Sequence, residues 1–360
     1  RCLEMPEFVN NPTRLGHPMK RAGERGENKW ERVSWEEALD LIEEKVRAIW
    51  KDYGPESIVC HIGTGRNNCD QIPYLCYAAF GSPNFSMGYL AGDSCFCPRS
   101  ASMASQNGDF MIADCSQQFE KRYDESTGWR CPEVIVNWGC NAVVSNSDNF
   151  FGGWIVDCMQ RGSKMITIDP SLTWLASRSA YWRVRPGTDA ALAMAMLNVI
   201  ISEDLYDHDF VDKWCYGFEE LSERVQEYPV DKVAEITWVS PEQIQRAARL
   251  LANSKPCAMQ WGLAVDMVRE ALPAGQAIVG LFQITGNVDI PGGNIFPVEL
   301  IAYSGGWGGE LISDEQKAKR IGLANYPLLR LGFQVASNDD LLDTLLTDKP
   351  YKMRGSWAPQ

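Results

Sequence analysis

The chain has 360 residues, 45% of them hydrophobic, so it can bury a large core and form about two domains of ordinary size. It carries 34 lysines and arginines against 47 aspartates and glutamates, which gives a net charge of −13. This charge argues against non-specific binding to nucleic acid or to anionic lipid, whose phosphates repel an acidic surface. No stretch approaches the roughly 20 apolar residues that a membrane-spanning helix needs.

The first third of the sequence predicts a helix, a strand and a second helix. Ser34 is suited to cap the first helix, and Glu37 is suited to be the reciprocal partner of a capping box. This helix runs through Trp50, and its apolar residues recur at helical spacing, which predicts a structural role. Residues 56–62 have the pattern of a buried strand, and the following Gly63-Thr64-Gly65 turn leads into a helix that ends near residue 80.

A second unit is predicted from about residue 133 to residue 290. Strand 134–136 leads through a tight turn to a helix, and another strand follows, which gives a βαβ repeat of about 30 residues. This spacing is typical of the nucleotide-binding half of a doubly wound sheet. In this repeat the helix is 150–160 and the second strand is 165–168. The other elements predicted in this unit are strand 182–184, helix 189–201, helix 241–252, strand 258–261 and helix 274–284.

Three turns of this unit are candidates for nucleotide binding, because each follows a short apolar strand. They are Trp138-Gly139-Cys140-Asn141, Asp169-Pro170 and Pro186-Gly187-Thr188-Asp189. The first turn lacks the GxGxxG pattern, which argues against an NAD or FAD site. Asp169 and Asp189 could accept hydrogen bonds from a ribose or from the edge of a guanine. Spacing alone supports equally well that Asp189 caps a helix and that Asp169 ends a strand.

The cysteines are numerous, but they do not form a recognisable disulfide or zinc pattern. The chain has 12 cysteines, scattered and without a CxxC pair, and only three histidines. A zinc site therefore has few ligands to draw on.

A series of motifs resembles the dimethyl sulfoxide reductase superfamily of molybdenum and tungsten enzymes. The resemblance covers nearly the whole chain, and the combination of motifs is specific to that family. The residues that carry it are 18–26, 30–39, 138–141, 161–164, 168–170, 185–192, 207–211 and 286–294.

The resemblance implies an α/β fold with two doubly wound, Rossmann-like domains, one inserted in the other and the first incomplete. It divides the chain into four parts. Residues 1–32 correspond to a remnant of an N-terminal iron–sulfur domain and residues 33–130 to the first part of the second domain. Residues 131–300 correspond to a third domain that binds a molybdopterin guanine dinucleotide, and residues 301–360 to a truncated connection back to the second domain.

The resemblance also implies the cofactors: a molybdenum or tungsten ion held by two molybdopterin guanine dinucleotides, and an Fe4S4 cluster. The residues that resemble the contacts to one dinucleotide are Trp138, Gly139, Cys140, Asn141, Asp169, Pro170, Gly187, Thr188 and Asp189. The family more often has Asn-Pro where this chain has Asn141-Ala142, and Cys140 also departs from the commoner pattern.

In family members with a protein ligand to the metal, that ligand lies in the loop corresponding to residues 92–101. Cys97 is our candidate, because a small-residue helix starts just after it and a helix N-terminus lowers the pKa of a thiol. Cys95 is the reserve candidate, and both could instead be inert thiols. Arg99 could stabilise an anionic substrate or a developing oxyanion. Asp93 and His61 could handle protons.

The two ends of the chain predict that it is a fragment of a longer catalytic subunit, inactive by itself. Cys2 resembles the last of the four cysteines that hold the family's Fe4S4 cluster, and it is either a cluster ligand separated from the other three or a coincidence. Residues 349–357 resemble the segment by which family chains re-enter the second domain. The sequence does not decide between export by the twin-arginine route and a cytoplasmic location.

The function implied is a two-electron transfer of an oxygen atom or a hydroxyl group to or from a small substrate. Residues 97–99 and 146–154 are most similar to anaerobic members that act on small organic molecules, reductive dehydroxylases included. The expected partners are an iron–sulfur electron-transfer subunit and a membrane-anchor subunit, and no nucleic acid. Two alternatives stay open: a non-redox hydratase-like member, and a non-catalytic module that binds a nucleotide or a partner subunit.

Overall fold

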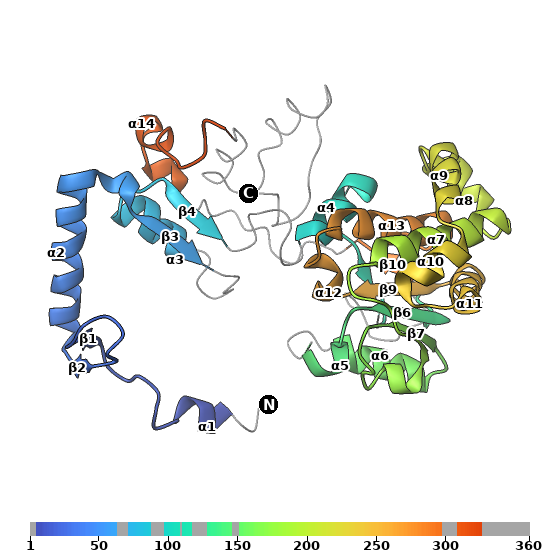
Figure 1. The fold of residues 1–360 in the computed structure, drawn as a ribbon, viewed down its shortest axis with the longest axis horizontal. Helices are drawn as coiled ribbons and strands as arrows, with labels where there is room; N and C mark the ends of the chain where they lie inside the picture. Colours follow the sequence, from blue (N-terminus) through green and yellow to red (C-terminus); the bar gives the residue numbers. More distant parts are fainter. Residues whose placement is uncertain are drawn as a thin grey trace. The chain divides into compact units, whose positions relative to one another are not determined.

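The computed structural model describes residues 5–62, 71–87, 97–108, 110–116, 128–145, 151–296 and 308–325. They divide into two units, which are described separately (Figure 1). The first unit comprises the described residues up to Ser86 together with residues 308–325. The second comprises the described residues from Met87 to residue 296. The four-part domain division of the sequence analysis stays a prediction.

The first unit contains two small sheets, one long helix and several short turns of helix. Strands β1 and β2 are antiparallel, and β3 pairs with β4. The elements are α1 (Met5–Val9), β1 (Met19–Arg21), β2 (Trp30–Arg32), α2 (Trp35–Tyr53), η2 (Pro55–Ser57), β3 (Val59–Ile62), α3 (Gln71–Tyr74), η3 (Leu75–Ala79), β4 (Asn84–Met87), η7 (Gly309–Leu311) and α14 (Asp314–Lys317).

Helix α2 starts as predicted but differs from the prediction in two other respects. The Ser34 hydroxyl accepts a hydrogen bond from the Glu37 N–H at 3.0 Å. The Glu37 carboxylate, predicted to complete a capping box, instead lies 3.6 Å from the Lys20 ammonium. No residue of α2 is buried among the described residues, and Trp35 and Leu39 are 69% and 58% exposed. The apolar periodicity therefore predicted the helix correctly, but it did not predict that the apolar side chains are exposed among the described residues.

The second unit is built on a four-stranded parallel sheet in the order β8-β7-β6-β9. The strands are β6 (Val134–Trp138), β7 (Lys164–Ile168), β8 (Ala180–Trp182) and β9 (Cys257–Trp261). The chain adds β7 and β8 on one side of β6 and then returns to place β9 on the other side. The strand order thus reverses between β6 and β9, and such a switch point at the carboxyl ends of parallel strands is where α/β sheets bind ligands.

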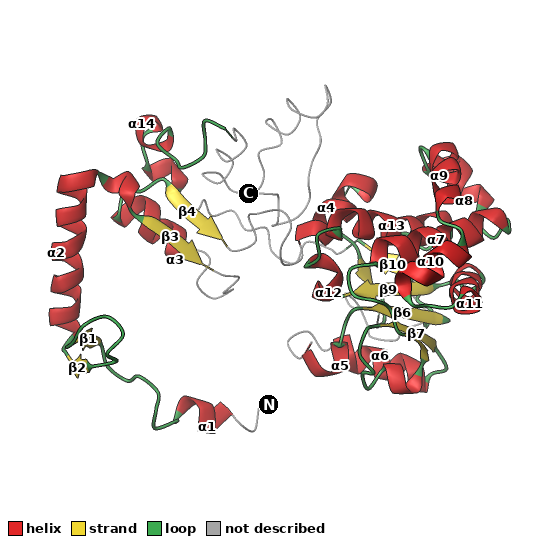
Figure 2. Cartoon of the chain, in the orientation of Figure 1, coloured by secondary structure: helices red, strands yellow, loops and turns green. Residues whose placement is uncertain are grey.

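Helices cover both faces of this sheet, because alternate residues of β6 point to opposite sides. Val134 and Val136 pack in one core with α7 (Asp189–Ser202), α11 (Pro241–Ala252) and α13 (Ala271–Ile284). Ile135 packs in a second core with α6 (Phe151–Gln160). Figure 2 shows these helices on either side of the strands. The predicted α/β class is confirmed.

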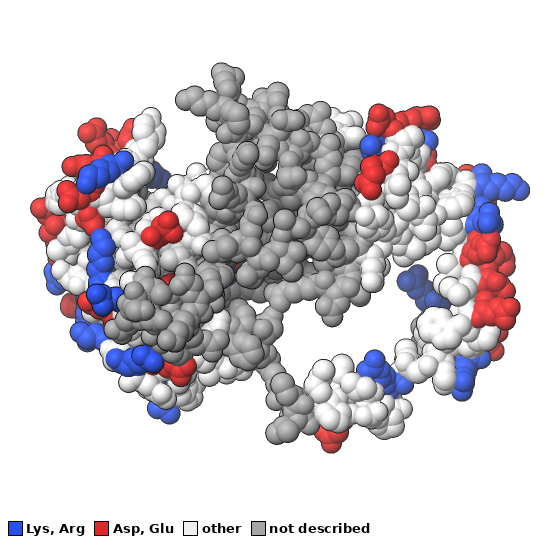
Figure 3. Space-filling view, turned by 180° about the vertical axis from the view of Figure 1, so that it is seen from behind, with Lys and Arg blue, Asp and Glu red and all other residues white. Residues whose placement is uncertain are grey.

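Shorter elements complete the second unit. They are α4 (Cys97–Asn107), β5 (Ile112–Ala113), α5 (Ala142–Ser145), η5 (Ala176–Arg178), α8 (His208–Trp214), α9 (Phe218–Arg224), η6 (Val225–Glu227), α10 (Val230–Thr237), α12 (Leu263–Asp266) and β10 (Asn294–Ile295). None of the described helices is long and apolar enough to cross a bilayer. Acidic and basic side chains are interspersed over the described surface in Figure 3.

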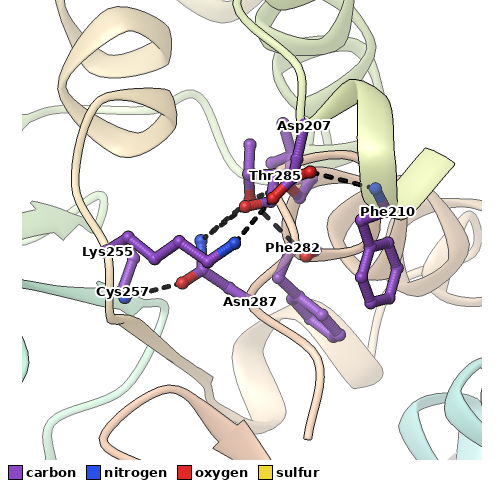
Figure 4. A network of polar contacts seen from close by, with 8 residues as sticks. Asp207, Phe210, Lys255, Cys257, Phe282, Thr285 and Asn287 are labelled. Carbon is purple, nitrogen blue, oxygen red and sulfur yellow. Dashed lines mark hydrogen bonds and ion pairs between the residues drawn. The ribbon is translucent and has the colours of Figure 1, made fainter. Parts of the chain in front are cut away.

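A buried polar network holds the segment after α13 against strand β9 (Figure 4). The Asn287 side-chain oxygen accepts a hydrogen bond from the Cys257 N–H at 2.8 Å, and the side-chain amide nitrogen donates to the Thr285 hydroxyl at 3.0 Å. Nearby, Asp207 accepts hydrogen bonds from the Phe210 N–H at 3.0 Å and from the Lys255 ammonium at 2.6 Å. The network fixes the start of β9, the strand that borders the switch point.

Replacing Asn287 with Ala should lower the free energy of unfolding by about 1–3 kcal/mol, because the buried Cys257 N–H loses its acceptor. Urea denaturation followed by tryptophan fluorescence measures the change. Asn253→Ala is the matched control, since this exposed amide only donates to the Arg249 carbonyl at 2.7 Å. Equal losses in the two variants would contradict the structural role given to Asn287.

Candidate cofactor site

The turns after β6 and β9 meet at the switch point and are joined by backbone hydrogen bonds. The Gly262 N–H donates to the Trp138 carbonyl at 2.8 Å. The Gly139 N–H donates across to the carbonyl of Ile168, the last residue of β7, at 2.7 Å. Three adjacent strands are therefore linked at their carboxyl ends by the residues of the predicted nucleotide turn.

Glycine is required at the closest point of this junction. A Cβ atom at Gly262 would lie 2.2 Å from the Gly139 carbonyl oxygen and 2.8 Å from the Cys140 Cα. Gly139 itself has a φ of +56°, a conformation that other residues rarely adopt. Gly187 is different: its φ is +80°, and nothing lies within 4 Å of where its Cβ would be. The turn before α7 thus has open space at this position.

Two asparagines beside the junction carry buried acceptors with no partner. The Asn137 amide donates to the Cys140 carbonyl at 2.6 Å, but its own side-chain oxygen accepts nothing. The side-chain oxygen of Asn141 is also buried and without a partner. A buried acceptor left unpaired costs stability, so two of them at a strand switch point indicate a ligand with N–H or O–H donors. Sequence reasoning missed Asn137, although an amide interrupting an apolar strand was the available signal.

Asp169 and Asp189 both lie at this end of the sheet, and both are at least nine-tenths buried. Burial raises the pKa of each carboxyl group, and the charge of Asp169 further raises the pKa of Asp189. Asp189 accepts a hydrogen bond from the Trp138 indole N–H at 2.7 Å. The structure therefore brings together two carboxylates, and neither is paired with a basic side chain among the described residues.

The sequence also allows two purely local roles for these aspartates: Asp189 as a helix cap and Asp169 as the end of a strand. The structure agrees with these roles only in part. Asp189 is the first residue of α7, but Thr188 is the N-cap, and its hydroxyl donates to the Arg185 carbonyl at 2.7 Å. Asp169 follows β7 and accepts from the Ser171 N–H at 2.8 Å, as a strand-ending turn requires. A local role thus accounts for one acceptor of Asp169, whereas Asp189 does not serve as the helix cap.

Arg99 is held in a buried ion pair. Its guanidinium donates to one carboxylate oxygen of Asp266 at 2.5 Å, and the other oxygen accepts from the Trp261 indole N–H at 3.0 Å. Burial raises the pKa of Asp266, and Arg99 opposes that rise. Burial likewise raises the pKa of the Cys140 thiol, while the positive charge of Arg99 lowers it. Arg99 and Cys140 therefore share one environment, but the charge of Arg99 is compensated within the protein.

The other predicted site residues lie in different places. Pro170 is half-buried directly after Asp169. Cys97 is the first residue of α4, and its side chain is outside the described residues. His61 is exposed on β3, in the first unit. Cys2, Asp93 and Cys95 lie outside the described residues. Within the described part of the chain, no group of three or more His, Cys, Asp or Glu side chains could hold a metal ion.

A family model for molybdopterin oxidoreductases matches residues 14–341, which is most of the chain. The chain belongs to the molybdopterin oxidoreductase family. It is 31% identical to the acetylene hydratase of Syntrophotalea acetylenica over 96% of its length. It is also 31% identical to the dimethyl sulfoxide reductase DmsA of Escherichia coli K12 over 82% of its length. These results confirm the resemblance to the dimethyl sulfoxide reductase superfamily.

The structural comparison agrees with the family assignment. The acetylene hydratase from Pelobacter acetylenicus superimposes with a TM-score of 0.73 at 31% identity, over 97% of this chain. This chain covers 46% of that structure, 48% of the hydratase sequence of Syntrophotalea acetylenica and 38% of the DmsA sequence. It thus spans less than half the length of these relatives. Family membership implies a molybdenum–pterin cofactor.

The burial of Asp169 gives a prediction about stability and pH. Its pKa is raised in the folded state, so between the unfolded and folded pKa values the native protein binds more protons than the unfolded one. Stability contributed by this group is therefore present at acid pH and lost as the pH rises through the folded pKa. At about pH 7, the Asp169→Asn variant should have a free energy of unfolding equal to or higher than that of the parent protein. This difference in stability should vanish near pH 3, where aspartate is protonated in both the folded and the unfolded state.

The measurement is urea denaturation of the cofactor-free protein across this pH range. Asp212→Asn, which makes the same substitution at an exposed position on α8, is the matched control. An Asp169→Asn variant that is less stable at neutral pH than at acid pH, relative to the parent, would contradict the assignment.

Proposed function

We propose that the full-length protein is an oxidoreductase that binds a molybdenum or tungsten bis-molybdopterin guanine dinucleotide, one of whose nucleotides occupies the site at the carboxyl ends of β6, β7 and β9. The observation that carries this proposal is the pair of buried carboxylates, Asp169 and Asp189, beside the unpartnered acceptors of Asn137 and Asn141. A guanine base presents N–H donors along one edge, which is what a group of acceptors requires.

The residues present fit such a nucleotide. The carboxylates of Asp189 and Asp169 would accept from the guanine amide and amino groups or from a ribose hydroxyl. These hydrogen bonds would offset the cost of burying two carboxylates without cations. The turn of Gly139 and Cys140 would let the backbone approach the pyrophosphate closely, and Gly187 has open space around it in the turn before α7.

The residue types also suit the metal end of the cofactor. Cys97 is the proposed protein ligand, because a thiolate is a soft donor and the N-terminus of α4 favours the anionic form. When bound, the cofactor supplies a metal ion that exchanges two electrons as an oxygen atom or hydroxyl group is transferred. In the full-length protein, Cys2 with upstream cysteines would hold an Fe4S4 cluster, and an iron–sulfur subunit and a membrane anchor would be the partners.

A second candidate reaction is a non-redox hydration, which the 31% identity to an acetylene hydratase over 96% of the chain favours. The two reactions differ in electron balance. An oxygen-transferring enzyme consumes or releases two electrons per turnover, whereas a hydratase turns over without an electron donor or acceptor. Turnover assays with and without an artificial electron carrier therefore separate them. Reductive dehydroxylation of a small organic substrate is the oxidoreductase reaction to assay first.

We predict that Asp189→Asn lowers the guanine nucleotide content of the full-length protein by about half, because one of two dinucleotides loses its acceptor. Asparagine keeps an oxygen for the Trp138 indole but turns an N–H₂ group toward the base. Guanine nucleotide released from denatured protein is quantified by chromatography. Asp212→Asn is the control and should keep the full content.

The same variant tests the purely structural alternative. If Asp189 only accepts the Trp138 hydrogen bond, the asparagine variant should retain both nucleotides. Wild-type full-length protein that contains neither metal nor guanine nucleotide would overturn the proposed function.

A further inference from the structure

We infer that the Arg99–Asp266 ion pair positions the first turn of α4, and with it the proposed metal ligand Cys97, relative to the nucleotide turn of Gly139 and Cys140. The inference rests on the proposed function and deepens it by assigning Arg99 a positioning role instead of a direct action on substrate. Arg99 lies two residues after Cys97, so whatever fixes its side chain also fixes the turn from which Cys97 extends.

The partner of Arg99 belongs to the other half of the site. Asp266 is the last residue of α12, which begins directly after Gly262 at the end of β9. It is 1% exposed, and both of its oxygens are bonded, one to Arg99 and one to Trp261. The Arg99 guanidinium also lies 5.3 Å from the ring centre of Trp261, the last residue of β9. The first turn of α4 is thereby fastened to the end of a central strand.

The same α12 segment packs against the nucleotide turn. A Cβ at Gly139 would lie 3.2 Å from the Ala264 Cβ and 3.3 Å from a Val265 methyl, so the turn and the helix are in close contact. The Gly262 N–H bond to the Trp138 carbonyl fixes their relative position. Asp266 thus connects the helix that carries the proposed metal ligand to the turn proposed for the pyrophosphate. The two ends of one cofactor would be held at a set separation.

A second contact fixes the same turn of α4 from the side of α13. The Ser102 hydroxyl donates to the Pro98 carbonyl at 2.7 Å and lies 3.3 Å from the Leu272 carbonyl. A Cβ at Gly275 on α13 would lie within 2.4 Å of the Ser102 hydroxyl oxygen and 3.7 Å from the Pro98 carbonyl. The first turn of α4 therefore has no room to shift toward α13. This contact involves no charged group, so it allows an independent test.

The test uses full-length protein purified anaerobically, with metal content, guanine content and the electron paramagnetic resonance spectrum of the pentavalent metal as readouts. Asp266→Asn and Arg99→Met should each shift the g values by more than the wild-type line width. The double variant Arg99→Met/Asp266→Asn should shift them no further than either single variant, because the Arg99–Asp266 link is broken in all three. Glu203→Gln, which breaks the exposed Arg249–Glu203 pair, is the matched control and should leave the spectrum unchanged.

A second series keeps the inference testable if loss of the buried pair prevents folding. Gly275→Ala should displace the first turn of α4 and shift the g values in the same way. Adding Ser102→Ala removes the hydroxyl that the new methyl group would meet and should move the spectrum back toward the wild type.

The outcomes separate the two proposals. If folded variants of both series bind metal and their spectra are unchanged, the positioning role of the Arg99–Asp266 pair is wrong. A loss of turnover in Arg99→Met without any spectral change would also overturn it. Wild-type protein without metal and guanine nucleotide would overturn the proposed function and this inference with it.

Discussion

The second unit depends on the close approach of the turns that follow β6 and β9. The Gly262 N–H donates to the Trp138 carbonyl, and the missing side chain at Gly262 lets the two backbones touch. Since the strand order reverses between these two strands, the junction lies where a parallel sheet binds its ligand. Asn141 and Asp266 follow the two turns that this contact joins, and Asn137 lies in β6 next to Trp138.

The polar groups around the junction are costly for a protein without its ligand. Unpartnered amide oxygens and buried carboxylates lower stability, as does the buried Nε–H of Arg99, which has no partner, whereas the charges of Arg99 and Asp266 compensate each other. The contrast separates two kinds of residue. Asp169, Asp189, Asn137 and Asn141 have unused hydrogen-bonding capacity and suit ligand binding. Arg99 and Asp266 satisfy each other's charge and suit the fixing of neighbouring turns.

The sequence predicted local structure and family well, but not the contacts between distant segments. Strands β6, β7 and β9 and the capping role of Ser34 followed from apolar patterns and turn chemistry. The pairing of Arg99 with Asp266 could not be predicted, because Asp266 lies 167 residues away and no local pattern pairs the two. The exposure of the apolar side chains of α2 could not be predicted for the same reason. Periodicity shows which face of a helix is apolar, but not whether another segment covers that face.

The nucleotide site is tested most directly by a crystal structure of the full-length protein purified without oxygen, with anomalous data at the metal edge. A guanine base is expected at the carboxyl ends of β6, β7 and β9. Its amide or amino nitrogens should lie within hydrogen-bonding distance of Asp169 or Asp189, and the metal on the side of α4. Guanine density elsewhere, with both carboxylates bonded only to protein, would contradict it.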